Sequence, residues 1–222
     1  TIRVKATVKP EELADADILI VFVKSSATEV AVKQFAALAK PSAVAVTLQN
    51  GLGNERILRA AFCTERTAAG VTSQGATFLG PARIRHAGSG ATHLCMSDRR
   101  NEKLAGLVEL LNRAGFEAHL APDIDDLIWS KLIINVGINA LTALTGLPNG
   151  GLLEYPQTKA LMADLVQEAV RVAKAKGVKL TYPDPLAMVY SVAEKTARNC
   201  SSMLQDFDRL KPSEIDVING AI

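Results

Sequence analysis

The chain has 222 residues, of which 48% are hydrophobic and 22% charged, and its 25 basic and 23 acidic side chains give a net charge of +2. This balance is ordinary for a soluble globular protein and excludes a disordered chain. The charges are scattered without blocks, so the sequence indicates neither nucleic acid nor a membrane surface as a partner, and a small-molecule ligand is expected.

Cysteine and histidine usage narrows the function further. Three widely spaced cysteines fit reduced thiols in the cytoplasm better than a disulfide framework, and the three histidines share no metal-ligand spacing. We therefore expect a cytoplasmic protein with no metal site. The uninterrupted apolar runs are shorter than the roughly 20 residues that a membrane span needs, so no membrane segment is expected.

The first part of the chain alternates strand and helix patterns. Asp17–Lys24 is a continuous apolar run rich in β-branched residues, typical of a strand buried on both faces of a parallel sheet. Further strands are predicted at 43–48 and 67–72, and helices at 26–38 and 55–61. The strand 43–48 runs into the turn Gln49–Asn54, and open α/β sheets bind ligands at such carboxyl ends of strands.

The pattern changes after a small-residue turn at Ser73–Ala76. Residues 82–87 and 91–96, joined by Gly88–Gly90, predict a hairpin. A helix at about 101–114 and a strand at 116–120 follow. Beyond Pro122 only helical periods remain, with helices expected in the opening stretch, at 156–176, at 184–197 and from 201 onward.

These patterns predict an α/β chain with two domains. Residues 1–121 are expected to form a Rossmann-like, dinucleotide-binding parallel sheet, and residues 122–222 an all-helical substrate and catalytic domain. The segments 51–56 and 88–93 begin Gly-x-Gly but lack the third glycine of a dinucleotide fingerprint. The sheet thus looks as though it lacks its first strand and glycine turn. We expect these residues alone to bind a dinucleotide weakly.

One polar row stands out in the stretch Trp129–Leu144, a helical pattern that is otherwise apolar or small. Lys131, Asn135 and Asn139 follow each other at four-residue spacing, which places them on one side of a helix with about 3.6 residues per turn. Two interpretations are open. The row is either a lysine paired with a carboxylate beside two satisfied core asparagines, or the polar lining of a ligand cavity.

Three segments together resemble the ketopantoate reductase (2-dehydropantoate 2-reductase) family. They are Leu48–Asn54, the helix Trp129–Leu144 with its polar row, and Asn-x-Ser-Ser-Met-Leu-Gln-Asp at 199–206 followed by Ser-Glu-Ile-Asp-x-x-Asn-Gly at 213–220. The likeness runs over essentially the whole chain. It implies an enzyme with a Rossmann domain and a helical domain like that of 6-phosphogluconate dehydrogenase, which reduces a 2-oxo acid with NADPH in pantothenate biosynthesis.

The resemblance also implies a role for each matching residue. Lys131 becomes the proton donor, which suits an ammonium group beside the negative charge that develops on a reduced ketone oxygen. The implied substrate-binding residues are Asn50, Asn135, Asn139, Asn149, Ser202, Met203, Leu204 and Gln205. The implied cofactor-binding residues are Lys24, Asn50, Ala76 and Glu214, and Glu214 also meets a substrate hydroxyl.

Several of these residues have a structural alternative. Asn50 could supply left-handed backbone geometry in an Asn-Gly turn, and Ser201 or Ser202 could cap a helix. Lys24 could be a solvated charge at a strand end, and Glu214 a carboxylate favoured at a helix start.

Two rival functions stay open on the sequence. One is a related reductase of another 2-oxo acid, because pocket shape selects the substrate. The other is a non-catalytic fragment that serves as an oligomerisation or binding module. The choice of NADPH over NADH rests on the family alone, which also allows a homodimer through the helical domain. Family members continue for several helices beyond the position of Ile222, so a truncated helical domain is expected.

Overall fold

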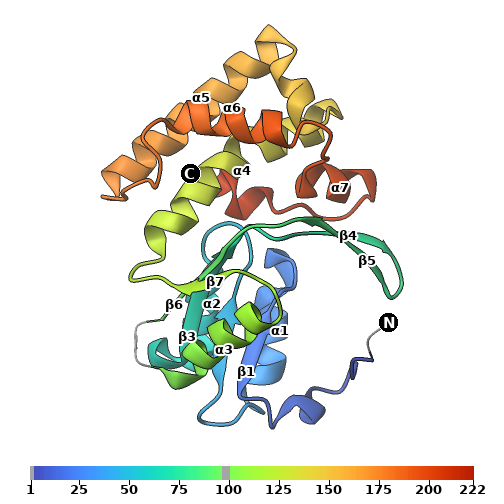
Figure 1. Ribbon diagram of the computed structural model, residues 1–222, viewed down its shortest axis with the longest axis vertical. Coiled ribbons are helices and arrows are strands. Elements are labelled where there is room, and N and C mark those ends of the chain that lie inside the picture. The colour runs from blue at the N-terminus through green and yellow to red at the C-terminus, as the bar shows by residue number, and fades with distance from the viewer. Residues whose placement is uncertain (1–2, 97–100) are drawn as a thin grey trace. The chain divides into compact units, whose positions relative to one another are not determined.

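A computed structural model describes residues 3–96 and 101–222 (Figure 1). The chain forms two compact units. The first contains the residues up to 49 together with 53–124, and the second contains Asn50–Leu52 together with Asp125–Ile222. The short segment Asn50–Leu52 therefore belongs to the helical unit although it follows a strand of the sheet.

A five-stranded mixed sheet forms the centre of the first unit, in the order β1-β2-β3-β6-β7. Its strands are β1 (Ile18–Val21), β2 (Val44–Thr47), β3 (Thr67–Thr72), β6 (Thr92–Met96) and β7 (Ala118–Leu120). The first three run parallel, β6 is antiparallel to β3, and β7 runs parallel to β6. The predicted α/β class is confirmed, with a sheet that is mixed rather than purely parallel.

Helices cover both faces of this sheet. They are α1 (Thr28–Ala36), α2 (Asn54–Phe62) and α3 (Glu102–Arg113). Alternate residues of a strand point to opposite faces, and accordingly Val44 and Val46 of β2 share an apolar cluster with Leu104 of α3. Ala45, between them, packs in a second cluster with Leu58 of α2. Burial on both faces explains the continuous apolar run of this strand.

The predicted hairpin between residues 82–87 and 91–96 is wrong. The hairpin instead pairs β4 (Gly75–Gly80) with β5 (Arg83–Gly88) in a separate two-stranded sheet. Its turn lies at Gly80–Ala82, where Gly80 has φ 147° and Ala82 has φ 57°. The expected small-residue turn at Ser73–Ala76 therefore runs directly into β4.

The strand that was assigned to the hairpin lies in the main sheet as β6, beside β3. Thr92, Leu94 and Met96 are buried, each separated by a half-buried residue. The β5 strand, in contrast, is exposed along its whole length. One face of β6 is apolar and must be buried. This requirement places β6 beside β3 in the main sheet, although β5 is closer in sequence.

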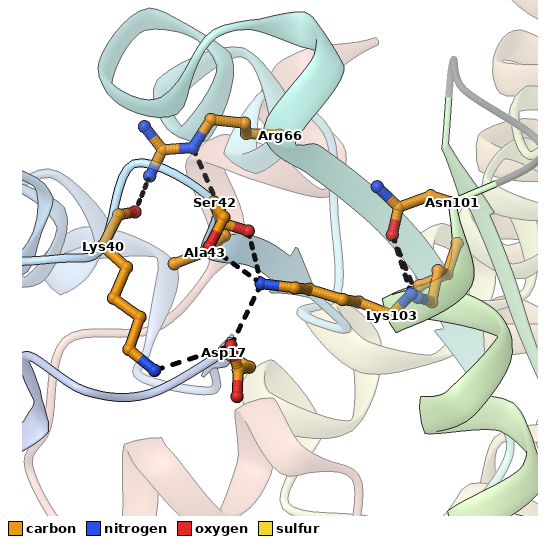
Figure 2. A network of polar contacts seen from close by, with 8 residues as sticks. Asp17, Lys40, Ser42, Ala43, Arg66, Asn101 and Lys103 are labelled. Carbon is orange, nitrogen blue, oxygen red and sulfur yellow. Dashed lines mark hydrogen bonds and ion pairs between the residues drawn. The ribbon is translucent and has the colours of Figure 1, made fainter.

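Polar contacts join the amino ends of the parallel strands (Figure 2). The Lys103 ammonium of α3 lies 3.0 Å from Asp17, just before β1, and donates to the Ser42 carbonyl oxygen at 2.8 Å, just before β2. Arg66, just before β3, donates to the carbonyl oxygens of Ala43 and Lys40, each at 2.9 Å.

This network adjusts the charge state of its carboxylate. The Lys103 hydrogen bond, followed by the Lys103 charge, holds the pKa of the exposed Asp17 carboxyl below its usual range. Exposed ion pairs add little stability, so the contacts mainly hold the loops before β1 and β2 and the start of α3 together.

The second unit is helical. Its helices are α4 (Asp125–Thr145), α5 (Pro156–Ala175), α6 (Pro185–Lys195) and α7 (Ser202–Asp208), with 3₁₀ turns at Asn149–Leu153, Ile215–Val217 and Asn219–Ala221. α4 contacts α5, α6 and α7 and forms the centre of the unit (Figure 1). The helix expected from 201 onward is short, and two 3₁₀ turns follow it.

α4 is longer and more apolar than the uninterrupted apolar runs of the sequence indicate. Among the described residues it is the one helix whose length and composition would allow it to cross a membrane. Most of its apolar window is nevertheless buried, and Leu132, Ile133 and Val136 lie in the core of the helical unit. A helix that is apolar nearly all round is expected at the centre of such a core.

We predict opposite effects of alanine at two helical glycines. A Cβ at Gly137 of α4 would lie 2.9 Å from a methyl carbon of both Val166 and Val189. Gly137→Ala therefore overpacks the crossing with α5 and α6 and lowers the free energy of unfolding by about 1–3 kcal/mol. A Cβ at Gly106 of α3 would meet no atom of the described residues within 4 Å, so Gly106→Ala raises it by about 0.5–1 kcal/mol.

Urea unfolding of both variants measures these changes, with Gly106→Ala as the matched control for the gain in helix propensity. A Gly137→Ala protein as stable as Gly106→Ala would contradict the close crossing of α4 with its neighbours.

Candidate active site

A chain of buried polar side chains lies at the carboxyl ends of β1 and β2 in the first unit. The Gln49 amide donates to the Val23 carbonyl oxygen at 2.6 Å and to the Thr28 hydroxyl at 2.8 Å. Thr28 donates in turn to Asn54 Oδ1 at 3.0 Å, and Asn54 donates to the Ser25 hydroxyl at 3.3 Å. These bonds fix the loop that follows β1 relative to the start of α2.

Two of the predicted cofactor-binding residues lie in this unit. Lys24 is exposed and sits in the loop that the Gln49 and Asn54 bonds hold. Ala76 is exposed on β4, opposite His86 of β5. The sequence singles out the turn Gln49–Asn54 at the carboxyl end of a strand but gives no role to its end residues Gln49 and Asn54, and it misses Thr28 of α1, which joins them.

The predicted polar row is present on α4. Lys131 and Asn135 are half-buried, and Asn139 is 7% exposed. Within residues 3–96 and 101–222, the side-chain amides of Asn135 and Asn139 make no hydrogen bond. The two side chains are therefore not core asparagines satisfied by the protein. Neither has a fully buried polar atom without a partner, so both amides can reach solvent or a ligand.

Lys131 carries a charge that its surroundings disfavour. Burial lowers the pKa of its ammonium from 10.5 to about 8, and the negative charge of Glu214 partly opposes this shift. Glu214 is 9% exposed and precedes the turn Ile215–Val217, where its side chain makes no capping hydrogen bond. An ammonium with a pKa near neutrality can donate a proton and recover it at physiological pH.

The start of α7 is tied to the same helix. The Ser201 hydroxyl accepts from the Leu204 N–H at 3.0 Å and lies 2.7 Å from the Thr142 hydroxyl of α4. Thr142 also donates to the Asn139 carbonyl oxygen at 2.8 Å. Ser201 is therefore the N-cap of α7, which is the structural role considered for it in the sequence analysis. Ser202 is half-buried, and its hydroxyl makes no hydrogen bond to the described residues.

The remaining residues of the α7 segment serve packing. The Met203 and Leu204 side chains are buried, Met203 in the core of the helical unit. Gln205 donates to the Cys200 carbonyl oxygen at 3.0 Å. Of the four residues predicted here, Ser202 thus has the free polar side chain.

Asn149 lies apart from the polar row, at the turn after α4. Its side-chain amide donates to the Thr196 hydroxyl at 2.8 Å, and its N–H donates to the Asn199 carbonyl oxygen at 3.0 Å. Asn149 is 8% exposed, and its Oδ1 has no hydrogen-bond partner among the described residues. These bonds hold the turn against the end of α6.

Asn50 belongs to the helical unit and does not supply the unusual backbone geometry of its turn. Gly51 and Gly53 have φ of 82° and 91°, whereas the non-glycine residues with positive φ in the described chain are Cys63, Ala82 and Leu210. The structural alternative for Asn50 is therefore wrong. Glycine is the residue that tolerates this conformation.

The first turns of α4 are also held by the segment that precedes α6. The Tyr182 hydroxyl donates to the Ser130 carbonyl oxygen at 2.7 Å, next to Lys131, and the Thr181 N–H donates to the Ser130 hydroxyl at 2.9 Å. Burial raises the pKa of the Tyr182 phenol above its usual range. The hydroxyl thus stays a donor, and the backbone at Lys131 is fixed.

The helical unit therefore carries a tuned ammonium and a buried carboxylate whose charges interact, together with two amides and a hydroxyl that make no hydrogen bond to the described residues. They come from α4, the start of α7 and the turn after it, which are far apart in sequence. Such a set can bind a small polar anion and stabilise and protonate an oxygen that becomes negative.

Comparison with known proteins identifies the family of the chain. Two family models match: Ketopantoate reductase PanE/ApbA over residues 1–98, and Ketopantoate reductase PanE/ApbA C terminal over residues 123–222. The 2-dehydropantoate 2-reductase of Archaeoglobus fulgidus is 37% identical over 222 residues, covering 100% of this chain and 72% of that protein.

Solved structures of similar fold include members of the same family. A PanE/ApbA family ketopantoate reductase from Ralstonia eutropha has a TM-score of 0.89 and 34% identity, covering 98% of this chain and 71% of its own. D-mandelate dehydrogenase, solved with NADH and anilino(oxo)acetate, has a TM-score of 0.87 and 27% identity, covering 96% of this chain and 70% of its own.

We predict that Glu214→Gln lowers the pKa of Lys131 below about 8, because the Glu214 charge is the influence that raises it. An NMR titration of protein labelled at lysine Cε, with the Lys131 signal assigned by its loss in Lys131→Met, measures this directly. A pKa that is unchanged or raised in Glu214→Gln would show that the two groups do not interact.

Proposed function

Because the chain belongs to the ketopantoate reductase family, we propose that it reduces the 2-oxo group of ketopantoate to the hydroxyl of pantoate with NADPH. Its relatives carry the name of an oxidoreductase of pantothenate biosynthesis. The observation that carries the proposal is the Lys131 ammonium, whose pKa of about 8 suits a proton donor, in line with two amides that have no protein partner among the described residues.

The substrate supplies a match for each polar group of the helical unit. Ketopantoate has a ketone, a carboxylate and a hydroxyl. In the proposal, Lys131 holds the ketone oxygen and gives it a proton as negative charge develops there. Asn135, Asn139 and Ser202 bind the carboxylate, and Glu214 accepts a hydrogen bond from the hydroxyl.

The other predicted residues have supporting roles in the proposal. Met203, Leu204 and Gln205 shape and hold the start of α7, and Asn149 holds the turn after α4. Asn50 is assigned to both substrate and cofactor. None of these roles needs a charged side chain.

The first unit is assigned to the cofactor. The exposed Lys24 cation lies at the carboxyl edge of parallel strands, in a loop held by the half-buried Gln49 amide and the buried Thr28 hydroxyl, which suits the nicotinamide side of a dinucleotide. Because neither Gly-x-Gly segment completes a dinucleotide fingerprint, weak binding by these residues is still expected. Lys24 and Ala76 would line the nicotinamide, together with Asn50 and Glu214. When bound, the reduced nicotinamide supplies the hydride for the 2-oxo carbon.

A second candidate is a reductase of a different 2-oxo acid. D-mandelate dehydrogenase, which is similar in structure and was solved with NADH, acts on an aromatic 2-hydroxy acid. Oxidation of that acid gives phenylglyoxylate, so the polar row alone is compatible with both substrates.

One experiment separates these candidates. The purified protein is assayed with ketopantoate, 2-oxoisovalerate, pyruvate and phenylglyoxylate, each with NADPH or NADH at saturating concentration, and oxidation of the cofactor is followed. We expect the highest kcat/KM for ketopantoate with NADPH. A preference for phenylglyoxylate with NADH would favour the second candidate, and the absence of turnover with all four acids would refute a reductase.

We predict that Lys131→Met lowers kcat by about 10²- to 10⁴-fold, the usual contribution of a positioned acid, and leaves the fold intact. Methionine keeps the apolar volume of the lysine stem. For the unmodified protein, kcat/KM should fall as the pH rises through about 8, because the proton donor is then lost. Lys195→Met, at an exposed position of α6, is the control and should keep full activity. A loss below tenfold in Lys131→Met would argue for a structural lysine.

We also predict that Glu214→Gln discriminates between substrates. Weakening a charge-assisted hydrogen bond costs on the order of 1.5–3 kcal/mol, so kcat/KM for ketopantoate should fall roughly 10- to 150-fold. The kcat/KM for 2-oxoisovalerate, which lacks the hydroxyl, should fall much less. Equal losses for both acids would mean that Glu214 acts on the cofactor or through Lys131 alone.

A further inference from the structure

The segment Glu214–Asn219 interacts with α4 in two ways, by the charge of Glu214 and by a hydrogen bond of Asn219. Glu214 acts on Lys131 through its charge. Asn219 lies five residues after Glu214, and Val136 lies five residues after Lys131. The Asn219 amide donates to the Val136 carbonyl oxygen of α4 at 3.1 Å. The segment therefore lies along α4 beside the polar row, with Ile218 fully buried between Glu214 and Asn219.

The Asn219 side chain makes one hydrogen bond at a cost in folding stability. Its Oδ1 atom is buried and has no hydrogen-bond partner among the described residues. A buried acceptor without a partner lowers stability, and an apolar residue of similar size would avoid this loss. Ile218 already anchors the segment in the core. The main effect of the Asn219 bond is therefore to fix the position of the segment along α4.

The loop Asn50–Leu52 holds the same segment from another direction. The Leu52 N–H donates to the Val217 carbonyl oxygen at 2.9 Å. A Cβ at Gly51 would lie 2.5 Å from that oxygen and 2.7 Å from a methyl carbon of Val217. Since backbone and side chain both block this space, any larger residue at Gly51 must push the segment away.

We propose that Asn219 and Gly51 are positioning residues, which together hold the segment Glu214–Asn219 against α4 and keep the Glu214 carboxylate beside the Lys131 ammonium. The proposal rests on the proposed reductase function for its catalytic meaning, but the arrangement itself can be tested without turnover. Neither residue is assigned a contact with substrate or cofactor.

Glu214 is the described carboxylate whose charge shifts the pKa of Lys131. The other carboxylates on this segment and on the elements packed around α4 are not among the causes of that shift. They are Asp216 of the segment, Glu154 after the 3₁₀ turn, Asp164 and Glu168 of α5, Glu194 of α6, and Asp206 and Asp208 of α7. A displacement of the segment should therefore act on Lys131 through Glu214.

The test compares three variants by the lysine NMR titration described above. Asn219→Leu keeps the size of the side chain and removes the donor, and Gly51→Ala adds the obstructing Cβ. We expect both to lower the pKa of Lys131 in the direction of Glu214→Gln. The control is Asn112→Leu in the first unit, which removes the side-chain bonds to the carbonyl oxygens of Val108 at 3.0 Å and Ala118 at 2.8 Å and the bond from the Ala118 N–H at 3.1 Å. It removes at least as much hydrogen bonding as Asn219→Leu and should leave that pKa unchanged.

Turnover supplies the second measurement. In Asn219→Leu, the fall of kcat/KM with rising pH should begin at a lower pH than in the unmodified protein, and kcat/KM at pH 8 should fall in proportion to the protonated fraction of Lys131. Circular dichroism and urea unfolding check that each variant is folded. If Gly51→Ala does not fold, Asn219→Leu decides the outcome.

A folded Asn219→Leu protein with an unchanged Lys131 pKa would overturn the proposal. An equal shift in Asn112→Leu would overturn it as well, because the effect would then follow from lost stability. Absence of ketopantoate reduction by the unmodified protein would refute the proposed function, while the NMR titration would still decide whether Asn219 and Gly51 position Glu214.

Discussion

The helical unit depends on a balance between the cost of burying the Lys131 charge and the attraction of Glu214. Burial alone favours the neutral amine, and a carboxylate nearby favours the ammonium. With the pKa at about 8, the two effects leave a lysine that is charged at neutral pH yet close to releasing its proton. Either effect alone would give a worse acid, since full solvation holds the proton too tightly and uncompensated burial removes it.

This balance constrains segments that are distant in sequence. Lys131 is fixed by α4, whose first turns are held by Tyr182 through the Ser130 carbonyl oxygen. Glu214 sits on a turn that has little secondary structure of its own, so its position depends on contacts made by its neighbours. Asn219 and the Leu52 N–H supply those contacts. A segment that follows strand β2 is thereby built into the helical unit.

The sequence was sufficient to predict those helices and strands whose side chains repeat with the period of a helix or a strand. Spacing of about 3.6 residues per turn placed Lys131, Asn135 and Asn139 in one row, and strand patterns located β1, β2 and β3. The prediction that the run 17–24 is buried on both faces is wrong, because β1 is shorter, Ile18–Val21, and lies at the edge of the sheet with Ile20 exposed. Pairing between distant segments has no such signal. The hairpin was misassigned because β6 is chosen by burial against β3, and nothing local distinguishes it from a partner of β5.

The same reasoning explains which site residues were missed. Ser201 and Ser202 have equal cap propensity in the sequence, and only the contact with Thr142 decides that Ser201 is the cap. Asn219 stands in an Asn-Gly pair that predicts a turn, and its bond to Val136 follows from the packing of Ile218. Residues that act through backbone carbonyl oxygens of another segment leave no pattern of their own.

A final constraint follows from the polar groups that the fold leaves unsatisfied. Asn139 is nearly buried, Asn135 and Ser202 are half-buried, and none of their side chains bonds to another part of the described chain. None of the three has a fully buried polar atom without a partner, so their polar groups stay open to solvent or to a ligand. Such side chains on the inner helices of an otherwise apolar core, with a lysine whose charge is costly to bury, are the pattern expected when stability is given up for a binding site. If the proposed substrate binds to these groups, its polar atoms supply the missing hydrogen bonds, and a bound polar anion should stabilise the helical unit.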